Sequence, residues 1–195
     1  MYFNYFTGID IADREPTEFM TEVTESSIEK FEIDKRNNSI PTDIVIPDFY
    51  SGHFLTKRYS TKASQCQVRP DELYELCYTE SNMLRQIILQ YHGMVLDIVH
   101  SDFKTPYTTN AFHHFYLNTA IGSEEVIVEA TLGQFLINYR GIFIGSRIQL
   151  KELFINALQK DPSLFNSTWL WAREFFGESP EKMFEIIWGS KYVLS

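Results

Sequence analysis

Cysteine and basic side chains are scarce in this chain of 195 residues. It has two cysteines, and 17 lysine and arginine residues stand against 26 acidic ones. Two cysteines, Cys66 and Cys77, cannot form a dense disulfide framework, so we expect free thiols in a reducing compartment. The net charge of −9 argues against nucleic acid and anionic membranes as partners, because both attract clustered lysine and arginine.

Long apolar runs and several well-known motifs are also missing. No window holds 18 consecutive apolar residues, which argues against a membrane-spanning helix, and the first residues lack the regions of an ordinary secretory signal. Gly-x-Gly-x-x-Gly, Walker-type and Gly-x-Ser-x-Gly motifs do not occur. The metal-binding spacings Cys-x2-Cys and His-x3-His are absent too, so we expect neither a metal nor a cofactor.

The acidic side chains are concentrated at the start of the chain. Residues 1–50 hold 11 acidic and four basic side chains, a net charge of −7, and the remainder is nearly neutral. We therefore expect an acidic N-terminal arm, 1–62, packed on a body of residues 63–195. The aromatic residues of the arm favour packing, although a disordered acidic tail is an alternative. Within it, 16–31 could form a short helix and 43–46 a strand.

Apolar spacing in the body predicts an α+β fold, in which a helix packs on a mainly antiparallel sheet and further helices follow. A helix is expected to end at Gly93, which is a typical stop signal. Asp161-Pro162 and Ser179-Pro180 each place a capping residue before a first-turn proline. The expected strands cover 94–100, 111–119, 125–131 and 141–146, and the later helices cover 148–159, 163–176 and 180–188.

A histidine and a carboxylate are expected to meet in the central hairpin. If the turn is symmetric about residues 121–122, His114 lies opposite Glu129, and directly paired side chains are close enough for a hydrogen bond. The carboxylate would fix the imidazole tautomer and stabilise its charged form. A shift of one residue would pair His113 with Glu129 instead, so the register decides which histidine matters.

Cys77 is the preferred nucleophile for such a histidine. A thiol is the side chain most readily ionised near neutral pH, and a neighbouring imidazolium favours the thiolate. Cys77 lies in a helical stretch that leads into the hairpin, and a position at the helix N-terminus would stabilise its negative charge. Cys66 lies in a polar stretch with neither signal. The alternative for Cys77 is a buried structural thiol.

Three short motifs resemble one enzyme superfamily. The chain reads Cys-x3-Ser-x2-Leu from Cys77, His-Phe-Tyr from His114, and Ile-Val-Glu-Ala-Thr-Leu-Gly-Gln-Phe over 127–135. Across residues 70–150 this pattern resembles the papain-like and transglutaminase-like cysteine enzymes, particularly bacterial glutamine deamidase toxins and effectors. In that family a cysteine begins a helix, a His-Phe-Trp strand follows, and the next strand carries Asp-x-Thr before a Gln-Phe pair.

The resemblance implies a papain-like fold and a role for each matching residue. Cys77 would be the nucleophile, His114 the general base and acid, and Glu129 the residue that orients His114. Gln134 would help to stabilise the oxyanion. Two features depart from the family: Glu129 replaces the usual aspartate, and 71–76 replace the usual glycine-containing loop.

The resulting hypothesis is a cysteine-dependent amide hydrolase or acyl transferase that deamidates or transamidates a glutamine of a protein substrate. The alternatives are a non-catalytic binding module on a degenerate papain-like fold, a cysteine protease and, more remotely, a metal hydrolase. Family analogy alone implies delivery into a host cell as an effector. The C-terminal aromatic residues are expected in the core, with a docking surface as the alternative. The oligomeric state stays open.

Overall fold

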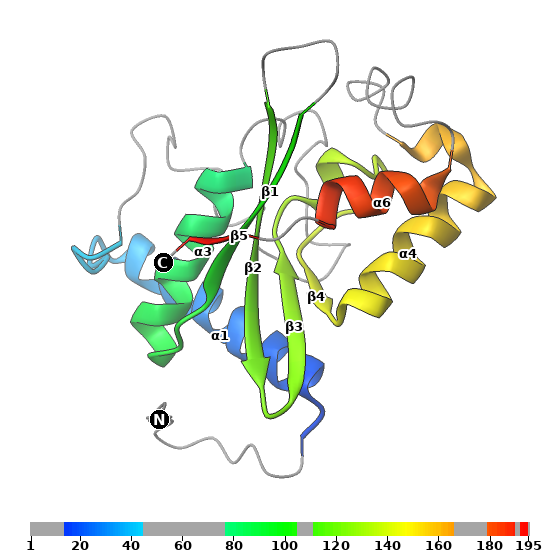
Figure 1. Cartoon of the computed structure of the whole chain (residues 1–195). Helices are drawn as coiled ribbons and strands as arrows, with labels where there is room; N and C mark the ends of the chain where they lie inside the picture. The colour runs from blue at the N-terminus through cyan, green and yellow to red at the C-terminus, as the bar shows by residue number, and fades with distance from the viewer. Residues whose placement is uncertain (1–13, 45–76, 105–110, 166–178, 190–191, 195) are drawn as a thin grey trace.

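The computed structural model of the chain describes residues 14–44, 77–104, 111–165, 179–189 and 192–194, and Figure 1 shows their arrangement. The helices are α1 (Pro16–Arg36), α3 (Cys77–His92), α4 (Arg147–Lys160) and α6 (Pro180–Trp188). The strands are β1 (Asp97–Lys104), β2 (Ala111–Ile121), β3 (Glu124–Glu129), β4 (Phe143–Gly145) and β5 (Tyr192–Leu194). The expected α+β class is confirmed.

The strands form one sheet in the order β4-β3-β2-β1-β5, and every neighbouring pair is antiparallel. β2 and β3 are joined by the two-residue turn Gly122-Ser123. Gly122 has a φ of +63°, which suits the first central position of a type II′ hairpin turn. The three-residue strand β5 was not expected from the sequence, and its pairing places the end of the chain beside β1.

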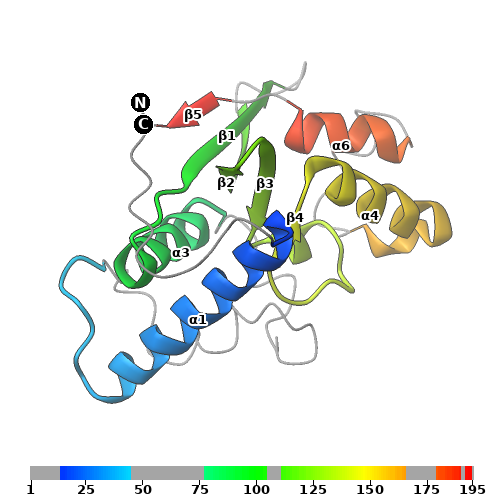
Figure 2. The ribbon, with the colours of Figure 1, turned by 90° about the horizontal axis from the view of Figure 1, so that it is seen from below.

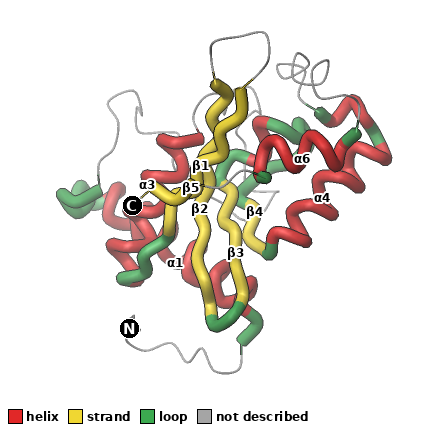
Figure 3. The backbone as a smooth tube through the Cα atoms, viewed as in Figure 1, coloured by secondary structure: helices red, strands yellow, loops and turns green. Residues whose placement is uncertain are grey.

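Helices cover both faces of this sheet (Figures 1 and 2). Alternate side chains of each strand point to opposite faces, so neighbours such as Tyr116 and Leu117 belong to different cores. The core that contains Leu117 is closed by α1 and α3. The core that contains Tyr116 is closed by α4 and α6. Figure 3 shows the strands as the middle layer between these helices.

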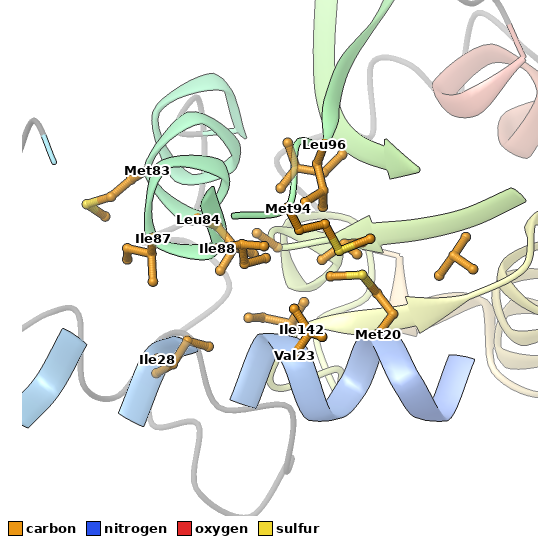
Figure 4. Close-up of a cluster of buried hydrophobic side chains, with 14 of the residues drawn as sticks. Met20, Val23, Ile28, Met83, Leu84, Ile87, Ile88, Met94, Leu96 and Ile142 are labelled. Carbon is orange, nitrogen blue, oxygen red and sulfur yellow. The ribbon is translucent and has the colours of Figure 1, made fainter. Parts of the chain in front are cut away.

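The α1 helix is built into the first of these cores. Met20 and Val23 of α1 and Leu84 and Ile88 of α3 belong to this core, part of which Figure 4 shows, and all four are at most 1% exposed. The helix continues past the expected end, residue 31, to Arg36, and Asn38 follows with a φ of +54°. The rest of the expected arm, 1–13 and 45–62, lies outside the described residues.

Two expectations from the sequence, a strand over 43–46 and a helix over 163–176, need correction. Asp43 and Ile44 lie in a turn rather than in a strand. Asp161-Pro162 begins a single 3₁₀ turn, Pro162–Leu164, after which Phe165 is extended. The expected helix over 163–176 therefore does not start there, and its remainder lies outside the described residues. None of the described helices is long and apolar enough to cross a membrane.

The two helices that close the second core begin at well-defined caps. Ser146 and Gln149 form a reciprocal capping box at the start of α4, and the Ser179 hydroxyl caps α6 ahead of Pro180. The apolar face of α6 ends with Trp188, which is fully buried. The Ser179 cap fixes where α6 begins, and the nine residues of the helix then place Trp188 against the sheet.

Candidate active site

His114 of β2 and Glu129 of β3 form a buried pair on the sheet face covered by α4 and α6. Their side chains are 0% exposed, and Nε2 of His114 lies 2.7 Å from Oε2 of Glu129. The expected histidine–carboxylate contact is therefore present. Unpaired burial of either charge would be strongly unfavourable, so the two groups depend on each other.

The register that brings them together differs from the expected one. The turn falls at Gly122-Ser123, so Leu117 pairs with Val128 and the position opposite Glu129 is Tyr116, not His114. Tyr116 and His114 are two residues apart and share a face. Glu129 therefore reaches His114 diagonally, and the additional methylene of glutamate compared with aspartate suits that longer reach.

Three further hydrogen bonds hold the Glu129 carboxylate. Oε1 accepts from the backbone N–H of Thr131 at 2.8 Å and from its hydroxyl at 2.9 Å. Oε2 also accepts from Nε1 of Trp188 at 3.1 Å. Burial alone would raise the pKa of Glu129, but the charge of His114 and these donors lower it. The carboxylate is therefore ionised across the neutral range.

Gln134 joins the same network from the 3₁₀ turn Leu132–Gln134, and it is 1% exposed. Its Nε2 lies 2.9 Å from Oγ1 of Thr131 and 3.3 Å from Nδ1 of His114. Because the Thr131 hydroxyl gives its one proton to Glu129, it can only accept from Gln134. The Thr131 hydroxyl thus orients the Gln134 amide beside Nδ1 of the imidazole.

Cys77 approaches His114 from the other helical layer. It is the first described residue of α3 and is 6% exposed. Its Sγ lies 3.8 Å from the carbonyl oxygen of His113, and its proximity to the His114 imidazole raises the pKa of that histidine. Glu129 occupies Nε2, so Nδ1, which also lies 3.3 Å from Nε2 of Gln134, is the ring nitrogen that remains for the thiol. Residues 71–76, which decide whether the helix begins earlier, lie outside the described part of the chain.

The electrostatics favour a charged imidazole. Burial would lower the pKa of His114, but the Glu129 carboxylate and the Cys77 contact outweigh it and raise the pKa to about 9. Two aromatic rings, Phe135 and Trp188, lie edge-on to the imidazole at centroid distances of 4.9 and 5.7 Å. They exclude water and hold the plane of the ring. The arrangement can therefore stabilise a thiolate–imidazolium pair.

His113 does not belong to this cluster. Its side chain is exposed on the opposite face, where Nδ1 lies 2.8 Å from Nε2 of His100 and the two rings stack. The register alternative in which His113 meets Glu129 is therefore wrong. Cys66 lies outside the described residues. Within the described ranges, no group of three or more His, Cys, Asp or Glu side chains could hold a metal ion.

All four residues expected at the site thus come together: Cys77, His114, Glu129 and Gln134. Sequence reasoning missed Thr131 and Trp188 as their supporting donors. Thr131 had a local signal, because a threonine two residues after a carboxylate can donate to it. Trp188 had none, since 59 residues separate it from Glu129.

Comparison of the chain with protein-family models, with curated proteins and with solved structures gave no significant match. The geometry of this cluster is therefore the basis for assigning a function to the chain.

Proposed function

We propose that the chain is a papain-like, cysteine-dependent amide hydrolase or acyl transferase that acts on a glutamine side chain of a protein substrate. One observation carries the proposal. The imidazole of the buried His114–Glu129 pair lies beside the Cys77 thiol, whose Sγ is 3.8 Å from the adjacent His113 carbonyl oxygen and which raises the pKa of His114. A pair that served only to stabilise the core would not need a thiol beside the imidazole, whereas a nucleophile requires such a base.

In the first half of the reaction, His114 takes the thiol proton at Nδ1 and the Cys77 thiolate attacks the carboxamide carbon. A C–S bond forms and the carbonyl π electrons move to oxygen. The Gln134 amide is placed to donate to that oxyanion, a contribution worth about 10²–10³ in rate. The C–N bond then breaks, His114 gives its proton to the departing nitrogen, and ammonia leaves a thioester.

In the second half, His114 removes a proton from water, and the hydroxide attacks the thioester carbon. The C–S bond breaks, the proton returns to the thiolate, and the substrate side chain leaves as glutamate. Glu129 keeps the proton of Nε2 directed at itself throughout, so Nδ1 always faces the reacting atoms. An amine in place of water gives transamidation, and a backbone amide in place of the carboxamide gives proteolysis.

A non-catalytic binding module is the second candidate, and the burial of the cluster favours it. Cys77 is 6% exposed and the other three side chains are at most 1% exposed. Entry of a glutamine side chain therefore requires rearrangement around Sγ. A binding module that retained the fold would need no such opening.

Conversion of glutamine to glutamate in a peptide separates the two candidate functions. Purified protein is incubated with a library of glutamine-containing peptides, and peptide mass reports the conversion of amide to acid. We expect conversion by the wild type and none by Cys77→Ala. In parallel, the rate of Cys77 alkylation by iodoacetamide is compared with that of a model thiol at neutral pH. Slow alkylation that His114→Ala leaves unchanged, with no conversion, would establish the binding module.

A further inference from the structure

Two hydrogen bonds attach the start of α3 to β2. The Cys77 thiol donates to the carbonyl of His113, and the Ser81 hydroxyl donates to the carbonyl of Phe115 at 3.2 Å. From this pairing we infer that Ser81 is a positioning residue, which fixes the distance between the Cys77 sulfur and the His114 imidazole. The inference rests on the proposed function, because it assigns the contact a role in setting up the nucleophile.

The spacing of the two donors matches the spacing of the two acceptors. Cys77 and Ser81 are four residues apart in a helix, a rise of about 6 Å. The carbonyls of His113 and Phe115 are two residues apart in a strand, about 6.6–6.8 Å, and point the same way. One helical turn of α3 therefore lies along two residues of β2. Because His114 lies between the two acceptors, this match fixes its position along the strand relative to Cys77.

This contact lies beyond the end of the β2–β3 ladder. The pairing of β2 with β3 covers Leu117–Ile121, so Phe115 and His113 lie past it. Within the described residues, the side chains of Cys77 and Ser81 attach α3 to this stretch of β2 by hydrogen bonds. Sliding of α3 by a fraction of a turn would separate Sγ from the imidazole, and such misplacement can lower a rate by about 100-fold.

Of the two bonds, the one from Ser81 is the stronger anchor. A thiol is a weak donor, and Sγ of Cys77 lies 3.8 Å from its acceptor. The Ser81 hydroxyl is a normal donor, its side chain is 0% exposed, and it bonds to the strand rather than to its own helix. Cys77 can therefore release the His113 carbonyl and give its proton to His114 while Ser81 keeps α3 in place.

The test compares Ser81→Ala with Tyr91→Phe. Tyr91 is the control on the same helix, because its hydroxyl donates to Oδ2 of Asp34 in α1 at 2.7 Å. Both variants lose one hydroxyl and one hydrogen bond of α3, but only Ser81 joins α3 to β2. The readout is the alkylation rate of Cys77 between pH 5 and 10, with urea unfolding measured on the same samples.

We expect Ser81→Ala to lower the neutral-pH alkylation rate about fivefold to tenfold, the factor that corresponds to one ordinary hydrogen bond. Its pH profile should shift toward that of His114→Ala. Tyr91→Phe should lose at least similar stability and keep the wild-type profile, and Ser81→Thr, which retains the hydroxyl, should restore most of the rate. Wild-type reactivity in Ser81→Ala, or an equal loss of reactivity in Ser81→Ala and Tyr91→Phe, would overturn the proposal.

Failure of the proposed function and failure of the role of Ser81 give different experimental results. If the wild type converts no glutamine but its Cys77 still alkylates in a His114-dependent way, the proposed function fails and the role of Ser81 is still measured. If alkylation does not depend on His114, there is no coupled pair for Ser81 to position, and the inference fails for that separate reason.

Discussion

The two faces of the sheet bury different chemistry at adjacent residues of the same strand. On the face covered by α3, His113 is exposed and stacks on His100. On the face covered by α6, His114 is fully buried and bonded to Glu129. One step along β2 therefore separates a solvent-accessible histidine from one whose charge depends on a single carboxylate.

This difference shows where a reactive group can be assembled. Glu129 is the last residue of β3, and beyond it the thiol of Cys77 reaches His114 from the opposite layer. The histidine is thus enclosed by the second core, while its nucleophile comes from the first. β2 still pairs with β1 here, with Ser101 opposite His114, but its pairing with β3 has ended. A β3 strand that continued along β2 would occupy the place through which Cys77 approaches.

The largest expected effect is on peptide conversion, when alanine replaces the histidine on one face of the sheet or the other. His114→Ala should lower peptide conversion about 10²–10⁴-fold, the usual contribution of a general base. His113→Ala removes the adjacent imidazole from the exposed face and should retain most of the activity. Equal losses in the two variants would show that the choice of face does not matter. Conversion is measured by peptide mass under identical conditions.

Removal of the carboxylate should have the largest effect on folding. Glu129→Ala leaves His114 buried without its partner, and breaking such a pair typically costs about 3–5 kcal/mol. Glu125→Ala is the control on the same strand, because that side chain is only half-buried and accepts from Asn118. Its loss should be well below that of Glu129, as measured by urea unfolding. Comparable losses would contradict a buried, mutually dependent pair.

A smaller effect is expected from the indole nitrogen of Trp188. Trp188→Phe keeps an aromatic ring against His114 but removes the donor to Glu129, which should cost about 1–3 kcal/mol. Phe184→Leu removes aromatic packing from the same helix without touching the carboxylate. Only Trp188→Phe should change the imidazole NMR signals of His114. An unchanged signal in that variant would show that the indole serves packing alone.

Much of this comparison was predictable from the sequence, because it follows from local patterns. Alternating β-branched and aromatic residues gave β2 and β3, and a serine–proline pair gave the start of α6. The alternation also put His113 and His114 on opposite faces. The register was not predictable to the residue, since both Ile121-Gly122 and Gly122-Ser123 are acceptable turn centres for a glycine with positive φ. The pairing of Ile121 with Glu124 in the structure distinguishes them.

Long-range partners could not be predicted. Nothing near Glu129 in the sequence indicates that Trp188 will donate to it, because that contact depends on how α6 packs over the sheet. The helical position of α1 in the first core was also only partly expected: its start at Pro16 follows from local signals, but its continuation to Arg36 depends on packing against α3.

The last prediction concerns the pH dependence of stability, where two histidines should behave oppositely. The raised pKa of His114 means that its stabilising contribution is fully present below about 6.5, the usual value, and is lost as the pH rises through about 9. His92, the last residue of α3, hydrogen-bonds Ser26 of α1 at 2.7 Å. Burial and the charge of Lys30 lower its pKa against the opposing effect of Glu22.

A histidine with a lowered pKa binds its proton more readily in the unfolded chain, so its presence destabilises the fold as the pH falls below about 6.5. The free energy of unfolding of wild type minus that of His114→Gln should therefore decrease between pH 6.5 and 9. The same difference for His92→Gln should instead rise from pH 5 to 7 and then level off. Parallel curves for the two variants would contradict the opposite pKa shifts of His114 and His92.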